Sequence, residues 1–311
     1  MGFDLSALKE AVTKHGRVAR VAIAAVQGSS PREVGAAMLV WQGGQSGTIG
    51  GGALEYQLAK SALHNARTRL SQHALGPELG QCCGGAVQIV TEVYDLTTLP
   101  ETQHELIVRS VDGSEQMPLR VQKILAEARN LREPAKPQLC QGWFIEPGQK
   151  PSRELWVWGA GHVGRALVQT LAPLPEFATT WIDTGAERFP NNPPENVTCM
   201  PTASPAKLAV HAPQNAEHLI FTYSHALDFE LCHQLLSHNF AFAGLIGSKS
   251  KWARFRNRLA ALGHSDEQIA RITCPIGDPR LGKHPQAIAI GVGSALLNAS
   301  KTLAQPLRSF A

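Results

Sequence analysis

Two adjacent cysteines, Cys82 and Cys83, lie in the glycine-rich segment GQCCGG, residues 80–85. A cysteine thiolate is both a soft metal ligand and a good nucleophile. The flanking glycines let a ligand approach closely. Because adjacent side chains alternate in direction along an extended chain, we expect one thiol to face a ligand and the other to pack. The alternative is that both are small buried hydrophobic residues.

Two further loops in the same part of the chain carry groups that suit an anion. The segment GTIGGGALE (47–55) places Gly50, Gly51 and Gly52 before a helix, where N–H groups point at a bound anion. The segment GSSPR (28–32) adds two hydroxyls and a guanidinium. The three loops are compatible with one site for a phosphorylated, thiol-liganded cofactor, and equally with three tight turns.

A second glycine pattern, GAGHVG, supplies Gly159, Gly161 and Gly164 between an apolar strand and a helix. In a dinucleotide-binding fold these glycines permit the tight turn, the approach of a pyrophosphate and close packing of helix on strand. Asp183 follows nineteen residues after Gly164, where an acidic residue accepts hydrogen bonds from a ribose. The alternative is a Rossmann-type turn without a nucleotide.

Two more polar residues, His225 and Asp228, come directly after the apolar segment LIFTYS. The carboxyl end of a strand lines the ligand crevice of an open α/β sheet, which makes both residues candidates for cofactor binding. Equally, they are the first turn of a helix, where an acidic side chain is favoured.

The elements that must position these residues follow from hydrophobic periodicity. In the N-terminal part we expect a helix over 51–70 and strands over 17–27, 36–41, 45–50 and 86–95. From residue 153 onwards strands and helices alternate, which predicts a doubly wound parallel sheet. The fold class is therefore α/β, with an N-terminal mixed α/β domain and a C-terminal Rossmann-like domain.

The expected domains are 1–108 and 153–311, joined by a connector at 109–152 that is rich in proline and contains a short helix.

Composition sets limits on the class of protein. The chain has 311 residues, a net charge of +4 and no apolar stretch of the roughly 18 residues that a membrane span needs. The N-terminus lacks the pattern of a secretory signal, so we expect a reducing cytoplasm and no disulfide framework. The mild, dispersed positive charge does not indicate a nucleic-acid-binding protein.

Several ordered motifs together resemble the XdhC/CoxI family. In the N-terminal part these are GSSPREVGAAMLV, GTIGGGALE and GQCCGG. In the C-terminal part they are VWGAGHVGRAL, SHALDFELC, GLIGSKSKWARFRNRLAALG and CPIGDPRLGKHPQAIAI. The resemblance covers nearly the whole chain apart from the connector.

The resemblance implies a carrier rather than an enzyme. Members are expected to bind the molybdenum cofactor (molybdopterin), to hold it while a cysteine desulfurase supplies sulfur, and to insert it into apo xanthine dehydrogenase or a related molybdoenzyme. They are expected to act in the cytoplasm as homodimers. By position, Cys82 and Cys83 become candidate ligands of the molybdenum. Gly159, Gly161, Gly164 and Asp183 become candidates for the pterin phosphate or for a separate dinucleotide.

Three other functions stay open on the residues alone. A nicotinamide-dependent oxidoreductase would use the glycine turn, with Asp183 selecting NAD over its 2′-phosphorylated form. A sulfurtransferase would carry a persulfide on Cys82 or Cys83. A docking scaffold would have kept the fold without any small ligand.

Overall fold

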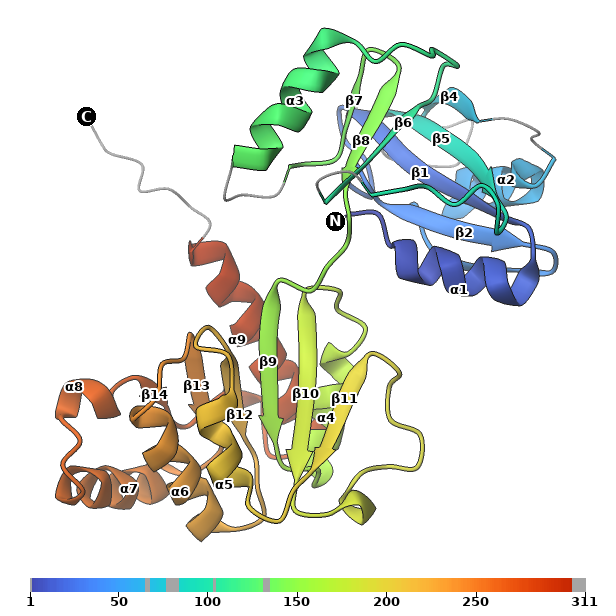
Figure 1. Ribbon diagram of the computed structural model, residues 1–311. Helices are drawn as coiled ribbons and strands as arrows, with labels where there is room; N and C mark the ends of the chain where they lie inside the picture. The colour runs from blue at the N-terminus through green and yellow to red at the C-terminus, as the bar shows by residue number, and fades with distance from the viewer. Residues whose placement is uncertain (1, 65–67, 77–83, 103–104, 131–134, 304–311) are drawn as a thin grey trace. The chain divides into compact units, whose positions relative to one another are not determined.

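The computed structural model describes residues 2–64, 68–76, 84–102, 105–130 and 135–303. The chain forms two compact units, Met1–Lys150 (unit 1) and Pro151–Ala311 (unit 2) (Figure 1). No helix in the described ranges is long and apolar enough to cross a membrane.

The first sheet of unit 1 has five antiparallel strands in the order β3-β2-β1-β5-β4. Its strands are β1 Val18–Gln27, β2 Ala37–Trp41, β3 Gly44–Gly47, β4 Arg69–Ala74 and β5 Ala86–Tyr94.

The central strand β1 is buried on both faces. Because side chains alternate along a strand, Ala19, Val21 and Ile23 point to one face, where they pack with helix α2, Gly52–Ala62. Val18, on the opposite face, packs with helix α1, Leu5–His15. Burial of the strand on both sides explains why the sequence reads there as an almost continuous apolar run.

The predicted helix over 51–70 is too long. Helix α2 ends at Ala62, and Leu70 lies on β4, where it pairs with Val90 of β5. Pairing with a strand that comes later in the chain overrides the four-residue apolar spacing that favoured a helix.

The second sheet of unit 1 lies in the segment expected to be a connector. It has three antiparallel strands in the order β6-β8-β7, with helix α3 inserted in the sequence. These elements are β6 Leu106–Ser110, α3 Leu119–Asn130, β7 Gln138–Cys140 and β8 Trp143–Pro147. The prediction of a connector over 109–152 is wrong for most of that range, because Pro118 and Pro147 mark ends of elements rather than irregular chain.

A buried network of four charged side chains joins the two sheets of unit 1. Both terminal nitrogens of Arg20 on β1 donate hydrogen bonds to the carboxylate of Glu146 on β8, at 3.0 and 2.7 Å. Arg109 of β6 donates to Glu92 of β5 at 2.6 and 3.0 Å, and also to Glu146. The ring of Phe3 lies beneath both guanidinium groups, 4.1 and 4.8 Å from their central carbons.

The charges in this network compensate one another. Burial by itself would raise the pKa of Glu146, but the charges of Arg20 and Arg109 outweigh it and hold that pKa below its usual 4.5. Each buried carboxylate faces a guanidinium, so the unit tolerates ions that would be costly if unpaired.

Unit 2 contains a six-stranded parallel sheet in the order β11-β10-β9-β12-β13-β14. Its strands are β9 Arg153–Trp158, β10 Phe177–Asp183, β11 Val197–Pro201, β12 Glu217–Ile220, β13 Phe242–Leu245 and β14 Ile272–Thr273. Strand order reverses between β9 and β12, and the carboxyl ends of strands at such a point line the ligand crevice of doubly wound folds. The predicted fold class is confirmed.

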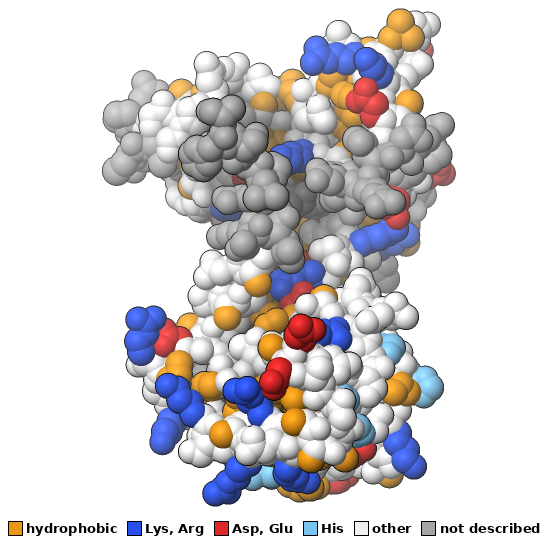
Figure 2. Space-filling view, turned by 90° about the vertical axis from the view of Figure 1, so that its left-hand side faces the viewer, with side chains coloured by type: hydrophobic (Ala, Val, Ile, Leu, Met, Phe, Trp, Pro, Cys, Tyr) orange, Lys and Arg blue, Asp and Glu red, His pale blue; other side chains and the backbone are white. Residues whose placement is uncertain are grey.

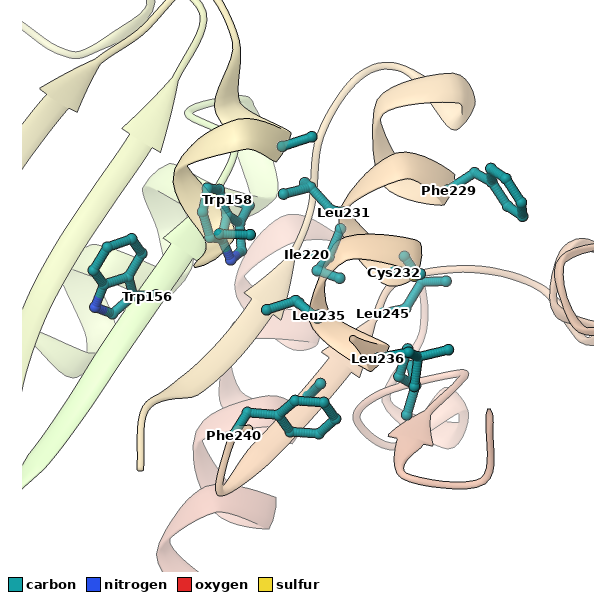
Figure 3. Packing of buried hydrophobic residues seen from close by; sticks show 14 of the residues in the cluster. Trp156, Trp158, Ile220, Phe229, Leu231, Cys232, Leu235, Leu236, Phe240 and Leu245 are labelled. Atoms are coloured by element: carbon teal, nitrogen blue, oxygen red, sulfur yellow. The ribbon is translucent and has the colours of Figure 1, made fainter. Parts of the chain in front are cut away.

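Helices cover both faces of this sheet. Helices α4 His162–Leu171 and α9 Pro285–Leu303 pack on one face with residues such as Leu155 and Val157. The other face is covered by α5 Pro205–Leu208, α6 His225–Leu236, α7 Lys249–Ala261 and α8 Asp266–Ile269. Figure 3 shows Leu231 and Leu235 of α6 against Ile220 of β12 and Trp158 of β9.

Glu146→Gln is expected to destabilise unit 1 by roughly 3–5 kcal/mol, because it leaves buried guanidinium charge without its carboxylate. Calorimetric unfolding of the full chain measures the effect. In the unmutated protein the depressed pKa of Glu146 adds stability that is present above about pH 4.5 and is lost as the pH falls through the lower, folded-state pKa.

The control is Glu105→Gln, since Glu105 forms an exposed ion pair with Lys150 and should leave the transition unchanged. Equal transitions for Glu146→Gln and the unmutated protein would contradict a structural role for the network.

Candidate functional site

The glycine turn of unit 2, Gly159–Gly164, joins β9 to α4 at the reversal of strand order. Gly159 has φ +111°, and a Cβ there would meet the Phe221 carbonyl oxygen at 2.5 Å. A Cβ at Gly164 would overlap the Gly159 carbonyl oxygen, whereas a Cβ at Gly161 would have no neighbour within 4 Å. Gly159 and Gly164 are therefore required by the turn itself, and Gly161 borders open space, as an approaching phosphate requires.

Asp183 holds this turn onto the end of β10. Its Oδ2 accepts a hydrogen bond from the Ala160 amide at 2.5 Å, and its Oδ1 accepts from the Thr184 amide at 2.6 Å and the Thr184 hydroxyl at 3.1 Å. The residue is 4% exposed. A carboxylate accepts about four hydrogen bonds. Three donors of the chain therefore already use most of the hydrogen-bonding capacity that a ribose would need.

Two arginines that the sequence analysis did not single out surround the turn. Arg165 donates to the Ala160 carbonyl at 3.0 Å and to the Arg188 carbonyl at 2.7 Å. Arg188, at the end of the 3-10 turn Ala186–Arg188, places Nε 3.5 Å from Asp183 Oδ1, and its guanidinium lies 4.8 Å from the Tyr223 ring centroid. Their positions in the sequence could have identified them, because Arg165 directly follows the third glycine and Arg188 lies in the loop after β10.

Asp228 lies in the first turn of α6 and ties together the ends of two strands. It is 1% exposed and accepts from the Thr222 amide at 3.2 Å, the Thr222 hydroxyl at 2.6 Å and Lys251 Nζ at 2.6 Å. Lys251 also donates to the Ile246 carbonyl at 2.9 Å, beyond β13. His225 is exposed at the start of the same helix. The contacts of Asp228 are thus with the loop at Thr222 and with Lys251 of helix α7.

Two of the described cysteines of unit 2, Cys232 and Cys274, are poor nucleophiles at neutral pH. Burial, with the nearby Asp228, raises the pKa of the Cys232 thiol far above its usual 9. Burial also raises the pKa of Cys274 to about 11, although Lys251 opposes the shift. Both thiols stay protonated near pH 7, whereas metal binding and nucleophilic attack need the thiolate.

The loops of unit 1 that the sequence analysis grouped together do lie together where they are described. Gly85 packs so closely on Gln27 and Ser29 that a Cβ would collide with their carbonyl oxygens, and a Cβ at Gly50 would meet Pro31 at 2.7 Å. The Leu75 amide donates to the Gly85 carbonyl at 2.7 Å, which closes the base of the β4–β5 connection. Cys82 and Cys83 lie outside the described residues, so their prediction as ligands stays a prediction.

Glu55 occupies the anion-binding position that the glycines were expected to offer to a ligand. Its Oε2 accepts from the Ile49 and Gly51 amides, each at 2.9 Å, and from the Thr48 hydroxyl at 2.5 Å. The Gly50 amide donates to the Thr48 hydroxyl at 3.0 Å. Burial by itself would raise the pKa of Glu55, but these hydrogen bonds lower it.

Gly50 and Gly51 therefore do not offer free amides. The Gly51 amide donates to Glu55 and the Gly50 amide donates to the Thr48 hydroxyl. Gly52 is the first residue of α2. A ligand phosphate at Gly50 or Gly51 would have to displace the Glu55 carboxylate or the Thr48 hydroxyl.

The cavity between these loops is small. It measures about 10 Å³ and is lined by Ser30, Gly51 and Glu55 together with apolar side chains. The Ser30 hydroxyl is buried there without a hydrogen-bond partner. This volume suits one water molecule and not a pterin, so a cofactor would lie on the outer side of the loops. Within the described part of the chain, no group of three or more His, Cys, Asp or Glu residues is placed to hold a metal ion.

The sheet order and the glycine turn define unit 2 as a Rossmann-type domain, and comparison with known proteins extends this assignment. Residues 155–296 match the model of the XdhC Rossmann domain, and residues 11–73 match the model of the XdhC and CoxI family. The chain belongs to the XdhC and CoxI family, as its motifs predicted.

The chain is also similar to one curated protein and to one solved structure. The uncharacterized protein YqeB of Escherichia coli (strain K12) is 24% identical over 279 residues, which cover 87% of this chain and 41% of YqeB. The chain thus spans about two fifths of that relative. A crystal structure described as a xanthine dehydrogenase from Bacillus halodurans is 22% identical, covers 99% of both chains and superposes with a TM-score of 0.71, which shows the same fold.

Gly161→Ala and Gly164→Ala are expected to separate ligand approach from folding. Gly161→Ala should leave thermal stability within about 1 kcal/mol, since the new methyl meets nothing, and should weaken binding at the turn. Gly164→Ala should lower the melting temperature strongly, because its methyl overlaps the Gly159 carbonyl. Thermal unfolding and nucleotide titration of both variants measure this, and equal melting of the two would argue against the described turn.

Glu55→Gln is expected to loosen the glycine loop of unit 1. Loss of a charged acceptor should cost about 1–2 kcal/mol locally and speed hydrogen exchange of the Ile49 and Gly51 amides. In the unmutated protein the same protection should fade as the pH falls below about 4.5, through the depressed pKa of Glu55. Glu33→Gln, an exposed change in the neighbouring loop, is the control; unchanged exchange in Glu55→Gln would contradict the assignment.

Proposed function

We propose that the chain carries the molybdenum cofactor and delivers it to apo xanthine dehydrogenase or a related molybdoenzyme. The observation that carries this proposal is membership of the XdhC and CoxI family, matched in both units. In this proposal the protein acts as a cytoplasmic homodimer and meets a cysteine desulfurase and the client enzyme in turn. It works as a carrier rather than as an enzyme.

The arrangement of unit 1 supports a role for the paired thiols. Gly85, the second described residue after Cys83, packs on the backbone of Gly28 and Ser29. The soft sulfur of a thiolate suits a metal that already has dithiolene sulfur ligands. Glycine backbone allows close approach, and the described cavity is too small to enclose the cofactor, so the cofactor would lie outside that cavity.

Unit 2 supports the phosphate part of the same proposal. Helix α4 begins after Gly161 without a side-chain cap, and a Cβ at that glycine would have no neighbour within 4 Å. A helix N-terminus stabilises a phosphate through these donors and the helix dipole. Gly159 and Gly164 shape the turn, and Asp183 fixes it.

The intact glycine turn also favours a second candidate function, a nicotinamide-dependent oxidoreductase. Its open space at Gly161 is what a dinucleotide pyrophosphate requires. Against it, the Asp183 carboxylate that would read the ribose is already bonded to Ala160 and Thr184. The two functions differ in the ligand that the protein holds when it is purified.

The test is analysis of the ligand released from protein purified without oxygen from a molybdenum-replete host. We expect pterin and molybdenum in near-stoichiometric amounts. Since even outer partners of a metal site are worth roughly 10–100-fold in affinity, Cys82→Ala or Cys83→Ala should lower the amount at least tenfold. Cys140→Ala, a partly buried cysteine of unit 1, is the matched control and should retain the ligand.

Other outcomes would replace the proposal. A nicotinamide dinucleotide in place of pterin would indicate the oxidoreductase, and a persulfide on Cys82 or Cys83 without pterin would indicate a sulfurtransferase. Pterin retained in both cysteine variants, with delivery to the client unchanged, would remove the thiols from the site.

A further inference from the structure

We propose that Arg188 makes the glycine turn of unit 2 selective for a ligand that carries a phosphate monoester, in preference to one that presents an unphosphorylated ribose diol. This inference rests on the proposed function only in that a phosphorylated cofactor binds at this turn. It reverses the preference for NAD that Asp183 suggested in the sequence.

The Asp183 carboxylate is already hydrogen-bonded within the protein. Three donors of the chain itself, the Ala160 amide and the amide and hydroxyl of Thr184, already use most of the hydrogen-bonding capacity of its two oxygens. The side chain is 3% exposed. A ribose diol needs an acceptor for its O–H groups, and this carboxylate is buried and committed to the turn.

Arg188 lies between Asp183 and Tyr223. Its Nε lies 3.5 Å from the Asp183 carboxylate at the end of β10, and its guanidinium lies against the ring of Tyr223, which follows β12. Strand β9 and its glycine turn lie between β10 and β12 in the sheet. The Arg188 side chain therefore reaches from one side of the turn to the other, at the end of the sheet where a ligand binds.

The guanidinium of Arg188 has donors that could reach a ligand. The Arg188 side chain is 36% exposed, but its Nε is buried beside the Asp183 carboxylate, so a ligand would meet the two terminal nitrogens of the guanidinium. A guanidinium has five donors and no acceptor, so it cannot receive a ribose O–H. It matches the oxygens of a phosphate, often through two parallel hydrogen bonds.

The backbone around Arg188 is held in place. Arg165 bridges the carbonyl oxygens of Ala160 and Arg188, so the loop after β10 is fixed to the glycine turn. The neighbouring acidic residue Glu187 has its carboxylate against Gly185. We assign Arg165 as a positioning residue, and its own charge adds to the positive potential at the turn.

The phosphate monoester could come from two sources. One is the 2′-phosphate of a dinucleotide such as NADPH, and the other is the terminal phosphate of a pterin. Both present the same dianion to Arg188, and neither needs the Asp183 carboxylate. A pterin conjugated to a nucleotide presents a pyrophosphate and a free ribose diol instead, so Arg188 favours the unconjugated pterin as cargo.

The experiment is a fluorescence titration of the full chain with NADPH and with NADH, on protein from a host unable to make the pterin cofactor. We expect NADPH to bind about 10–100-fold more tightly, the range for a hydrogen-bonded charged pair. Arg188→Gln should remove this ratio by weakening NADPH alone, and Arg188→Lys should restore part of it. Arg280→Gln, an exposed arginine of the same unit paired with Asp278, is the matched control and should keep the ratio.

Competition identifies the source of the phosphate. A pterin phosphate that displaces NADPH, where its dephosphorylated form does not, would show that pterin and 2′-phosphate share the Arg188 position; failure of both to compete would limit the position to the ribose phosphate. Equal or tighter binding of NADH, an unchanged ratio in Arg188→Gln, or no binding of either dinucleotide would overturn the inference. Each of these results leaves the analysis of copurified pterin unaffected, so the carrier function stands or falls separately.

Discussion

The hydrogen bond from the Ala160 amide to the buried Asp183 carboxylate is the constraint on which the site of unit 2 depends. It joins the glycine turn after β9 to the end of β10, so the turn and the neighbouring loop have one geometry. The Trp181 indole strengthens the same junction by donating to the Gly159 carbonyl at 3.0 Å. A carboxylate that fixes the turn has little capacity left for a ligand, and the partly exposed guanidinium of Arg188 lies beside it.

Unit 1 applies the same principle to a different loop. Glu55 accepts from the amides of Ile49 and Gly51, as Asp183 accepts from Ala160. In both units a glycine-rich turn that resembles an anion site from its sequence is stabilised by the chain's own carboxylate. The buried network of Arg20, Glu92, Arg109 and Glu146 extends this to the interior, where paired charges hold two sheets together although each ion by itself would be costly to bury.

The parts of the fold that sequence could predict are those with local causes. The turn of unit 2 was predictable because strand, glycines and helix follow one another within a few residues, and Gly159, Gly161 and Gly164 behave as their spacing indicates. The second sheet of unit 1 was not, because β6 and β8 are short and pair across the intervening α3 and β7. Likewise, the end of α2 depends on pairing of β4 with β5. The spacing of Asp183 was predictable, but its hydrogen-bond donors were not, since they depend on how two loops meet in space.

Fold alone therefore says little about which ligand would bind at the glycine turn. The sheet order of unit 2 is that of many dinucleotide-binding domains, and structural similarity at 22% identity carries the fold and not the ligand. The described residues are more informative than the fold: Asp183 is a carboxylate committed to the turn, Arg188 has a partly exposed guanidinium, and the cavity under the loops of unit 1 is water-sized. A ligand that suits these groups would be rich in phosphate charge and would bind at the surface of the loops, and the proposed carrier function needs such a site because deep enclosure would slow release of the ligand.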